Sequence, residues 1–271
     1  NPPAVLRDPT KLLIDLAVGG RRLVPGGVAL LASARYDGLL PPSAGWRRRF
    51  GGRRWRYDER GVYTEDLGNG PWRTEGEPET CRAMYRLYGP RILAAAARHG
   101  VNPALIMMTI ATEAAFARDD GFTGPKTFRW EGHVENTDVS PVFRGTYSAG
   151  PMQCLATTVR DMLKRHGTSY GLDRYDAFEV APALRPRPNP APANHPLYDP
   201  ETSIEIGAGE IRMRWSTTRD DPMLVAAAYN SGGIYPSQHS AWGMRAYDDH
   251  LDRAARWYGD ACAVLSEEGL L

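Results

Sequence analysis

"LIMMTIATEAAFARDD", residues 105–120, places a single carboxylate inside an otherwise apolar run. From residue 104 through residue 117, every side chain is apolar or a threonine except that of Glu113. Asn102 can cap a helix and the proline that follows suits a first helical turn, so a helix is predicted over 103–116. The segment therefore raises the question of what this carboxylate does.

On such a helix Glu113 shares its side with residues that belong to a core: Ile106, Thr109, Ile110 and Phe116. Burying an ionised carboxylate without a partner would cost several kcal/mol, and the usual outcome is a raised pKa that keeps the group protonated near neutrality. A proton held in this way can be donated, as the general acid in glycoside cleavage must do. A glutamate at the helix edge that reaches solvent or forms a salt bridge explains the same pattern.

Length and composition indicate a globular chain. Its 271 residues, 42% of them apolar, suffice for one large domain or for a catalytic domain with a smaller partner. The net charge of +1 argues against a nucleic-acid partner, although six arginines lie in "RRRFGGRRWR", residues 47–56. That run predicts either a solvated basic hairpin or an anion-binding patch. No apolar stretch reaches the roughly 18 to 20 residues that span a bilayer, so no membrane span is predicted.

Metal-binding patterns are weak in this sequence. The cysteines are too few and too scattered for a zinc site or a disulfide framework: Cys81, Cys154 and Cys262. His133 lies between Glu131 and Glu135, but no further His or Cys cluster completes a site. We therefore predict no metal and no cofactor, and the redox state of the cysteines stays open.

The chain divides by composition near residue 76. Before it, short runs with β-branched, aromatic or alternating character are separated by turn signals, which predicts strands over 11–18, 27–34, 53–59 and 61–67. After it, helical spacing dominates over 81–99, and further helices are predicted to begin at Pro200, to pass through 225–229 and to cover 246–265. Residues 117–149 suggest a hairpin or long loop, and the proline-dense 181–200 an extended loop. We expect an α+β, mainly α fold, with an N-terminal β-rich accessory region (1–76) and a helical domain (77–271).

Further motifs follow the Glu113 helix in order. They are "SAGPMQCLATT" (148–158), "LYDPETSIEIGAGEI" (197–211) and "AAAYNSGG" (226–233). Together with that helix they resemble the soluble lytic transglycosylase family. Its lysozyme-like domain has a Glu-Ser-x-Phe helix, a Gly-Leu-Met-Gln turn, an Asp-Pro-x-x-Asn-Ile-x-x-Gly helix and an Ala-Tyr-Asn-Ala-Gly helix end. The resemblance does not extend to the N-terminal region.

The resemblance implies a peptidoglycan-cleaving enzyme. Glu113 matches the single acid/base, which protonates the glycosidic oxygen between N-acetylmuramic acid and N-acetylglucosamine and then takes a proton from the muramoyl 6-hydroxyl as a 1,6-anhydro ring closes. Met152 and Gln153 match the turn that lines the cleft. Tyr229 matches the tyrosine that orients the glutamate, and Asn230 the residue that contacts the sugar. A core aromatic, a helix C-cap and an N-terminal helix residue are the structural alternatives for Tyr229, Asn230 and Gln153.

The sequence also departs from the family pattern. Ala114 stands where the family has serine, and Ser203 where it has asparagine. The interval after the helix contains several acids: Asp119, Asp120, Glu131, Glu135 and Asp138. An inverting hydrolase related to goose-type lysozyme or chitinase would need one of them about 6.5 to 9.5 Å from Glu113 to activate water. A solvated hairpin is the structural alternative for these acids.

A module that holds glycan without cleaving it, as in cell-wall-binding or phage tail proteins, is a third interpretation. A lone carboxylate in an apolar helix argues against it, because binding has no need of an acid. The expected partner is the peptidoglycan glycan strand, so the chain is expected to act outside the cytoplasm, in the periplasm, in the cell envelope or as a secreted or phage-encoded enzyme.

Overall fold

The computed structural model describes residues 45–68, 70–114, 130–131, 148–155, 158, 162 and 200–271. Its helices are α3 (Glu79–His99), α4 (Pro103–Ala114), α6 (Pro200–Met213), α7 (Trp215–Thr218), α8 (Pro222–Ser231) and α9 (His250–Glu267). Its strands are β1 (Trp55–Asp58), β2 (Gly61–Thr64), β3 (Trp130–Glu131), β4 (Ser148–Ala149) and β5 (Cys154–Leu155). The described part of the chain is thus mostly helical, as predicted.

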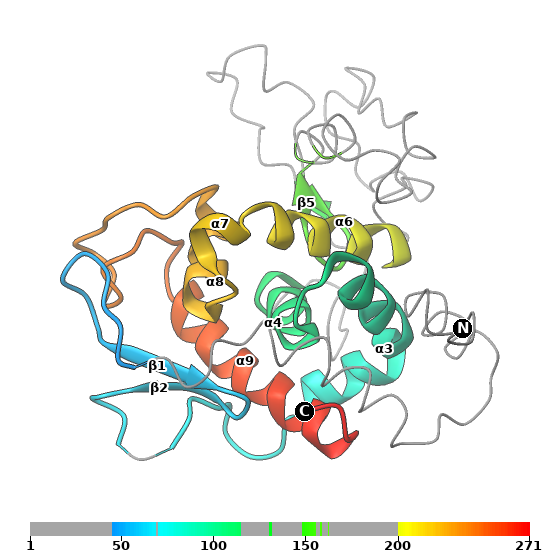
Figure 1. Cartoon of the computed structure of the whole chain (residues 1–271), viewed down its shortest axis with the longest axis horizontal. Coiled ribbons are helices and arrows are strands. Elements are labelled where there is room, and N and C mark those ends of the chain that lie inside the picture. Colours follow the sequence, from blue (N-terminus) through cyan, green and yellow to red (C-terminus); the bar gives the residue numbers. More distant parts are fainter. Residues whose placement is uncertain are drawn as a thin grey trace, which may run out of the picture.

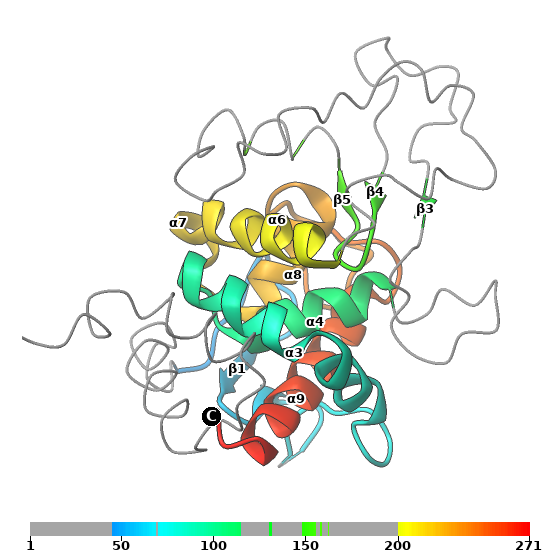
Figure 2. The ribbon, with the colours of Figure 1, turned by 90° about the vertical axis from the view of Figure 1, so that its right-hand side faces the viewer.

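Helix α4 lies in the middle of the bundle, with α3, α6, α8 and α9 around it (Figures 1 and 2). Every residue of α4 except Glu113 is buried. Its two threonines satisfy their hydroxyls within the helix, because Thr109 donates to the Leu105 carbonyl at 2.8 Å and Thr112 to the Met108 carbonyl at 2.6 Å. An apolar helix without a polar face can only lie at the centre of a domain, which is where α4 is found.

The predicted helix boundaries are confirmed at several ends. The Asn102 side chain accepts a hydrogen bond from the Ala104 N–H at 2.8 Å, as an N-cap does. Gly100 ends α3 with φ 64° and Gly232 ends α8 with φ 73°, both in the left-handed region that glycine adopts easily. The segments predicted as strands over 11–18 and 27–34, and the proline-dense segment 181–199, lie outside the described residues.

Two predicted N-terminal strands form an antiparallel hairpin, in which Trp55 pairs with Thr64 and Asp58 with Gly61. The hairpin packs against α9, and its buried Trp55, Tyr57 and Val62 belong to the same hydrophobic core as the helices. Residues 55–64 are therefore part of the helical body. The division of the chain at residue 76 stays a prediction.

The arginine run, residues 47–56, fastens this hairpin to the helices. Arg47 forms a 2.8 Å ion pair with the buried Asp221 at the start of α8. Arg53 binds Asp66 at 2.9 Å and Asp252 of α9 at 3.1 Å. Its guanidinium also lies 5.0 Å from the ring centroid of Trp72. These contacts show that much of the run has a structural role.

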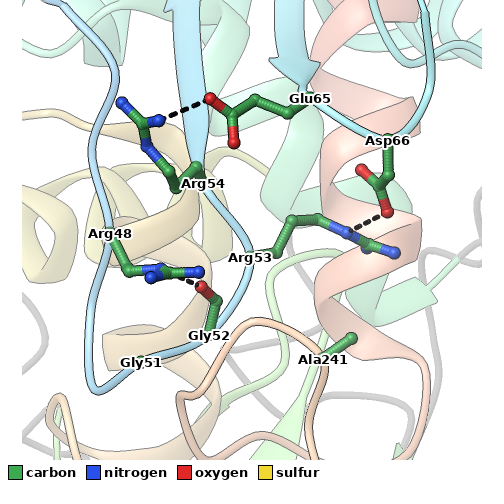
Figure 3. Close-up of a pocket in the computed structure, with 8 residues that line it drawn as sticks. All are labelled: Arg48, Gly51, Gly52, Arg53, Arg54, Glu65, Asp66 and Ala241. Atoms are coloured by element: carbon green, nitrogen blue, oxygen red, sulfur yellow. Dashed lines mark hydrogen bonds and ion pairs between the residues drawn. The ribbon is translucent and has the colours of Figure 1, made fainter.

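A shallow surface pocket lies beside the hairpin (Figure 3). It is lined by Arg48, Gly51, Gly52, Arg53, Arg54, Glu65, Asp66 and Ala241. Arg54 pairs with Glu65 at 2.6 Å, and the Arg48 Nε donates to the Gly52 carbonyl at 2.7 Å. Because the acids of the pocket neutralise most of its arginines, the structure favours a solvated, ion-paired hairpin over an anion-binding patch.

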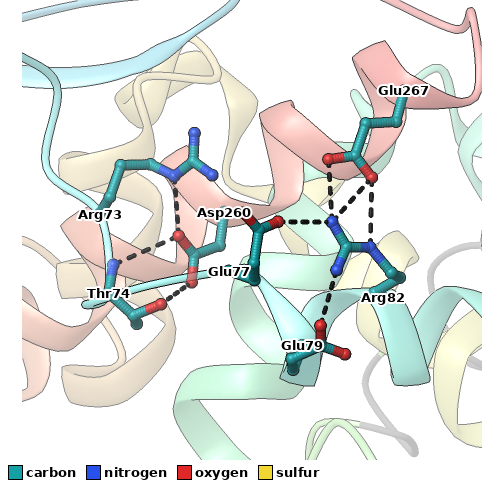
Figure 4. Close-up of polar contacts among 7 residues, drawn as sticks. All are labelled: Arg73, Thr74, Glu77, Glu79, Arg82, Asp260 and Glu267. Carbon is teal, nitrogen blue, oxygen red and sulfur yellow. Dashed lines mark hydrogen bonds and ion pairs between the residues drawn. The ribbon is translucent and has the colours of Figure 1, made fainter.

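The connection from the hairpin to α3 is tied to α9 by charged groups (Figure 4). Asp260 accepts hydrogen bonds from the Arg73 side chain at 2.8 Å and from the Thr74 hydroxyl. At the start of α3, Arg82 contacts Glu267 near the end of α9 at 3.1 Å. These contacts fix the positions of α3 and of the segment before it relative to α9.

A small antiparallel sheet lies next to α6, with strand order β3-β4-β5 (Figure 2). Trp130 pairs with Ala149, and Ser148 with Leu155. The pairing of β3 with β4 agrees with the predicted hairpin over 117–149. Among the described residues, none of the helices combines the length and apolar character needed to cross a membrane.

Candidate active site

Glu113 lies in the last turn of α4, where this buried helix reaches the surface. Its side chain is 17% exposed, so the carboxylate is mostly surrounded by protein but not fully buried. Within α4, the predicted general acid is therefore the one residue that is not fully buried. This placement follows from the sequence pattern, because a carboxylate in an apolar helix is stable only where the helix meets solvent or a polar partner.

The turn that contains Met152 and Gln153 is built against α6. Met152 is buried, and its N–H donates to the Ser203 hydroxyl at 3.1 Å. Gly207 of α6 makes room for it, because a Cβ at that position would lie 2.5 Å from the Met152 Cε. Ser203, which replaces the asparagine of the family motif, also accepts a bond from the Cys154 Sγ through its carbonyl at 3.5 Å.

Gln153 adopts a left-handed conformation with φ 48°, which is uncommon for a residue other than glycine. Its side-chain Nε2 donates to the Gly150 carbonyl at 2.9 Å, so the amide group closes its own turn. The side chain is almost wholly buried, at 6% exposure of the residue. A strained backbone held by its own side chain is typical of a rigid site loop.

Tyr229 connects this turn to α8. Its hydroxyl donates to the Met152 carbonyl at 2.8 Å and lies 3.7 Å from the Cys154 Sγ. Burial raises the pKa of Tyr229 well above its ordinary value, and the charges of its neighbours, Glu113 among them, act in the same direction. The phenol is therefore neutral, and it lies within electrostatic range of the carboxylate.

Asn230 follows Tyr229 in α8 and binds the loop that leads to α9. Its side-chain oxygen accepts a hydrogen bond from the Tyr247 N–H at 2.9 Å. The Tyr247 side chain itself is 76% exposed. Asn230 thus holds the loop over 232–249, which joins the two helices on either side of the site.

The structure adds two residues on α9 that the sequence interpretation missed. His250 is buried, and its Nε2 lies 3.9 Å from the Glu113 Oε1. Arg253 donates from Nη1 to the Thr112 carbonyl at 3.0 Å and pairs with Asp249 at 2.7 Å. A signal was present, because His250 occupies the apolar side of an amphipathic helix together with Ala254, Trp257 and Ala261.

A second buried carboxylate, that of Glu210 on α6, lies near Tyr229 and Cys154 and acts on the pKa of both. Burial raises its pKa, while its ion pair with Arg214, at 3.1 Å, acts in the opposite direction. Arg214 also donates to the Gly232 carbonyl at 2.6 Å, which ties α6 to the end of α8. Glu210 has a structural partner and is not exposed to a substrate.

The acids proposed for a hydrolase are placed only in part. Glu131 lies on β3, while Asp119, Asp120, Glu135 and Asp138 lie outside the described residues. The second-acid hypothesis therefore stays a prediction. In the described ranges, no group of His, Cys, Asp and Glu side chains is arranged to hold a metal ion, and the predicted lack of a metal stays a prediction.

The candidate site thus combines an acid on a central helix, a turn packed on α6 and a tyrosine near the end of α8. A family model described as the transglycosylase SLT domain matches residues 90–249, more than half of the chain. The chain belongs to the transglycosylase SLT domain family. Among curated proteins and solved structures, no match to the chain is found.

Membership confirms the resemblance to soluble lytic transglycosylases, a family of peptidoglycan-cleaving enzymes in the lysozyme-like superfamily. The mostly helical body is consistent with the SLT fold. The match begins inside α3 and ends just before α9. The hairpin, and both His250 and Arg253, therefore lie outside the matched segment, although they pack against it.

Proposed function

We propose that this SLT protein is a lytic transglycosylase that cleaves the β-1,4 bond between N-acetylmuramic acid and N-acetylglucosamine in peptidoglycan. In this proposal Glu113 is the single catalytic acid/base. The family supports the substrate class. The observation that carries the assignment to Glu113 is its position, as the one accessible residue of a buried helix next to the Met152–Tyr229 contact.

Two proton transfers complete the proposed reaction. The protonated Glu113 donates to the glycosidic oxygen as the bond from the anomeric carbon to that oxygen breaks, and N-acetylglucosamine leaves with a free hydroxyl. The resulting carboxylate then takes the proton from the muramoyl 6-hydroxyl, whose oxygen bonds to the anomeric carbon and closes the 1,6-anhydro ring. Water is not consumed, and Glu113 regains its proton.

Three described groups near Glu113 are neutral, and this supports the first step. Burial raises the pKa of the Tyr229 phenol and of the Cys154 thiol, so both keep their protons. Burial lowers the pKa of His250 to about 4, so this imidazole is uncharged near neutrality. Neutral neighbours in a partly buried setting favour a protonated carboxyl, which is the state that a general acid needs.

The other predicted site residues have distinct proposed roles. In this proposal Met152 and Gln153 form a rigid turn that lines the substrate cleft, and the hydrogen bond from Tyr229 to the Met152 carbonyl holds that turn in place. In this proposal Asn230, which also accepts the bond from the Tyr247 N–H, contacts the sugar at the cleavage site. Because peptidoglycan lies outside the cytoplasm, we propose that the protein acts in the cell envelope, as a periplasmic, secreted or phage-encoded enzyme.

Digestion of purified peptidoglycan tests this function. Wild type is expected to release muropeptides lighter than hydrolytic products by the mass of one water molecule, as seen by mass spectrometry. Glu113→Gln, which cannot exchange a proton, is expected to lose activity by about 10²- to 10⁴-fold. Glu205→Gln is the matched control, since Glu205 is also mostly buried but pairs with His99 at the other end of α4.

Products of full hydrolytic mass would contradict the lytic mechanism and direct attention to the acids over 119–138. Full activity of Glu113→Gln would contradict the assignment of the acid. Equal loss of activity in both variants, with loss of folded structure, would instead indicate that any buried carboxylate is required for stability.

A further inference from the structure

His250 faces the proposed acid from a different helix. It is the first residue of α9, and its Nε2 lies 3.9 Å from the Glu113 Oε1. This separation is about 1 Å longer than a hydrogen bond, so a small rearrangement on substrate binding would bring the two atoms into contact. The backbone of His250 is held in place, because its N–H donates to the Tyr247 carbonyl at 3.0 Å.

The imidazole ring is also anchored and neutral. It hydrogen-bonds the Ala226 backbone of α8, and burial lowers its pKa to about 4, with a smaller contribution from Arg253. Asp249 acts in the opposite direction on His250, while its side chain pairs with Arg253. A neutral imidazole carries one N–H and one lone pair, so the partner of the N–H decides which atom faces the carboxyl group.

We propose that Nδ1 of His250 donates to the Ala226 carbonyl and that the Nε2 lone pair faces Glu113, which makes His250 the positioning residue that keeps this acid protonated. The proposal rests on the proposed role of Glu113. A hydrogen-bond acceptor facing a carboxyl group stabilises its protonated form and disfavours the carboxylate. The same lone pair favours return of the proton in the second step, which suits a group that acts first as acid and then as base.

The other described titratable groups near Glu113 have partners of their own. Tyr229 of α8 uses its hydroxyl hydrogen to bind Met152, and the Cys154 thiol of β5 binds the Ser203 carbonyl. Glu210 of α6 lies behind them, paired with Arg214. The cationic Arg253, whose Nη1 donates to the Thr112 carbonyl, acts in the opposite direction to His250 and favours the carboxylate. Among the described side chains, His250 is neutral and its Nε2 lies 3.9 Å from the Glu113 Oε1, a position from which its lone pair can favour the acid form.

The pH dependence of turnover tests the proposal. His250→Asn removes the atom at the Nε2 position while retaining a group where Nδ1 lies. The basic limb of the kcat profile on peptidoglycan, which reports loss of the acid's proton, is expected to move to lower pH by about one unit. His99→Asn is the matched control, because His99 is also a buried histidine but bonds Glu205 on α6. An unchanged limb, or the same shift in His99→Asn, would overturn the proposal.

Nitrogen NMR of the folded wild type gives a second test that needs no variant. In protein labelled with ¹⁵N-histidine, the imidazole that stays neutral down to about pH 4 is expected to carry its hydrogen on Nδ1. A hydrogen on Nε2 would overturn the proposal. Activity of Glu113→Gln would contradict the proposed function. If Glu113→Gln is inactive and the basic limb of the kcat profile is the same in His250→Asn as in wild type, only the proposed role of His250 is contradicted.

Discussion

At the scale of single residues, two adjacent aspartates at the start of α8 have opposite environments. Asp221 caps the helix and accepts hydrogen bonds from Met223 at 3.0 Å and from the Trp55 indole at 3.1 Å. Asp220 is also buried, but within the described residues neither of its carboxylate oxygens has a hydrogen-bond partner. Burial raises the pKa of Asp220 to about 7, while Arg212 acts in the opposite direction.

Asp220 should therefore make stability depend on pH. Its folded-state pKa of about 7 exceeds the ordinary value of 3.8, so its contribution is complete below pH 3.8 and is lost as pH rises through 7. Asp220→Asn cannot titrate and tolerates the left-handed backbone at φ 56°. Relative to this variant, wild type is expected to lose up to about 4 kcal/mol of unfolding free energy between pH 4 and pH 8.

Denaturant unfolding of both proteins across that range measures the difference. Parallel curves for wild type and Asp220→Asn would contradict the expectation and would mean that Asp220 stays solvated. Asp221→Asn provides a contrast, because it removes a charge that Arg47 and Trp55 already satisfy. That variant is expected to be destabilised over the whole range, since the partly buried guanidinium of Arg47 loses its anionic partner.

At the scale of elements, the helices were predictable and the turns between them were not. Local signals located α4 and the ends of α3 and α8, because a cap or a left-handed glycine acts through neighbouring residues. The chain turns before α8 through Arg219 and Asp220, which both adopt left-handed conformations. Because neither residue is a glycine, the sequence contained no signal for this turn. Glu113, Met152 and Tyr229 could be named because they lie in motifs, whereas His250 approaches the site only through packing of α9 on α4.

The contact between α6 and the Met152 turn gives a prediction about an element. Alanine normally stabilises a helix relative to glycine by about 1 kcal/mol. At Gly207, however, a Cβ would lie 2.5 Å from the Met152 Cε and 2.8 Å from its Cβ. Gly207→Ala is therefore expected to destabilise the protein by about 1 to 3 kcal/mol through overpacking and to reduce cleavage by displacing the turn.

A double-mutant cycle with Met152→Ala identifies the cause. If the clash is responsible, Gly207→Ala should be much less harmful when Met152 is already alanine, and the coupling should appear in unfolding free energies. Additive effects of the two substitutions would show that Gly207 matters for another reason.

At the scale of the whole molecule, the N-terminal hairpin and the helices share one core. Trp55 is fully buried and its indole lies 6.0 Å from that of Trp242, in the loop before α9. The sequence predicted the hairpin from its alternation and turn signals, but it did not predict the core that the hairpin shares with the helices. Packing between distant segments carries no local signature, which is why the shared core could not be foreseen.

Substitution of Trp55 tests whether this body unfolds as one unit. Trp55→Ala is expected to lower the unfolding free energy by about 3 to 5 kcal/mol, in a single transition that includes the helices. Trp46→Ala, at a residue that is 41% exposed, is the control and should change stability by about 0.5 kcal/mol or less. A separate early transition that leaves helix content unchanged in circular dichroism would mean that the hairpin folds independently.

The central claim is that Glu113 cleaves glycan by transferring one proton out and one back, with the sugar's own hydroxyl in place of water. The most direct measurement is digestion of purified peptidoglycan in water enriched in heavy oxygen, followed by mass spectrometry of the released muropeptides. Anhydro products without label are expected from the wild type, and none are expected from Glu113→Gln. Heavy oxygen at the newly formed sugar end would contradict the central claim and establish hydrolysis.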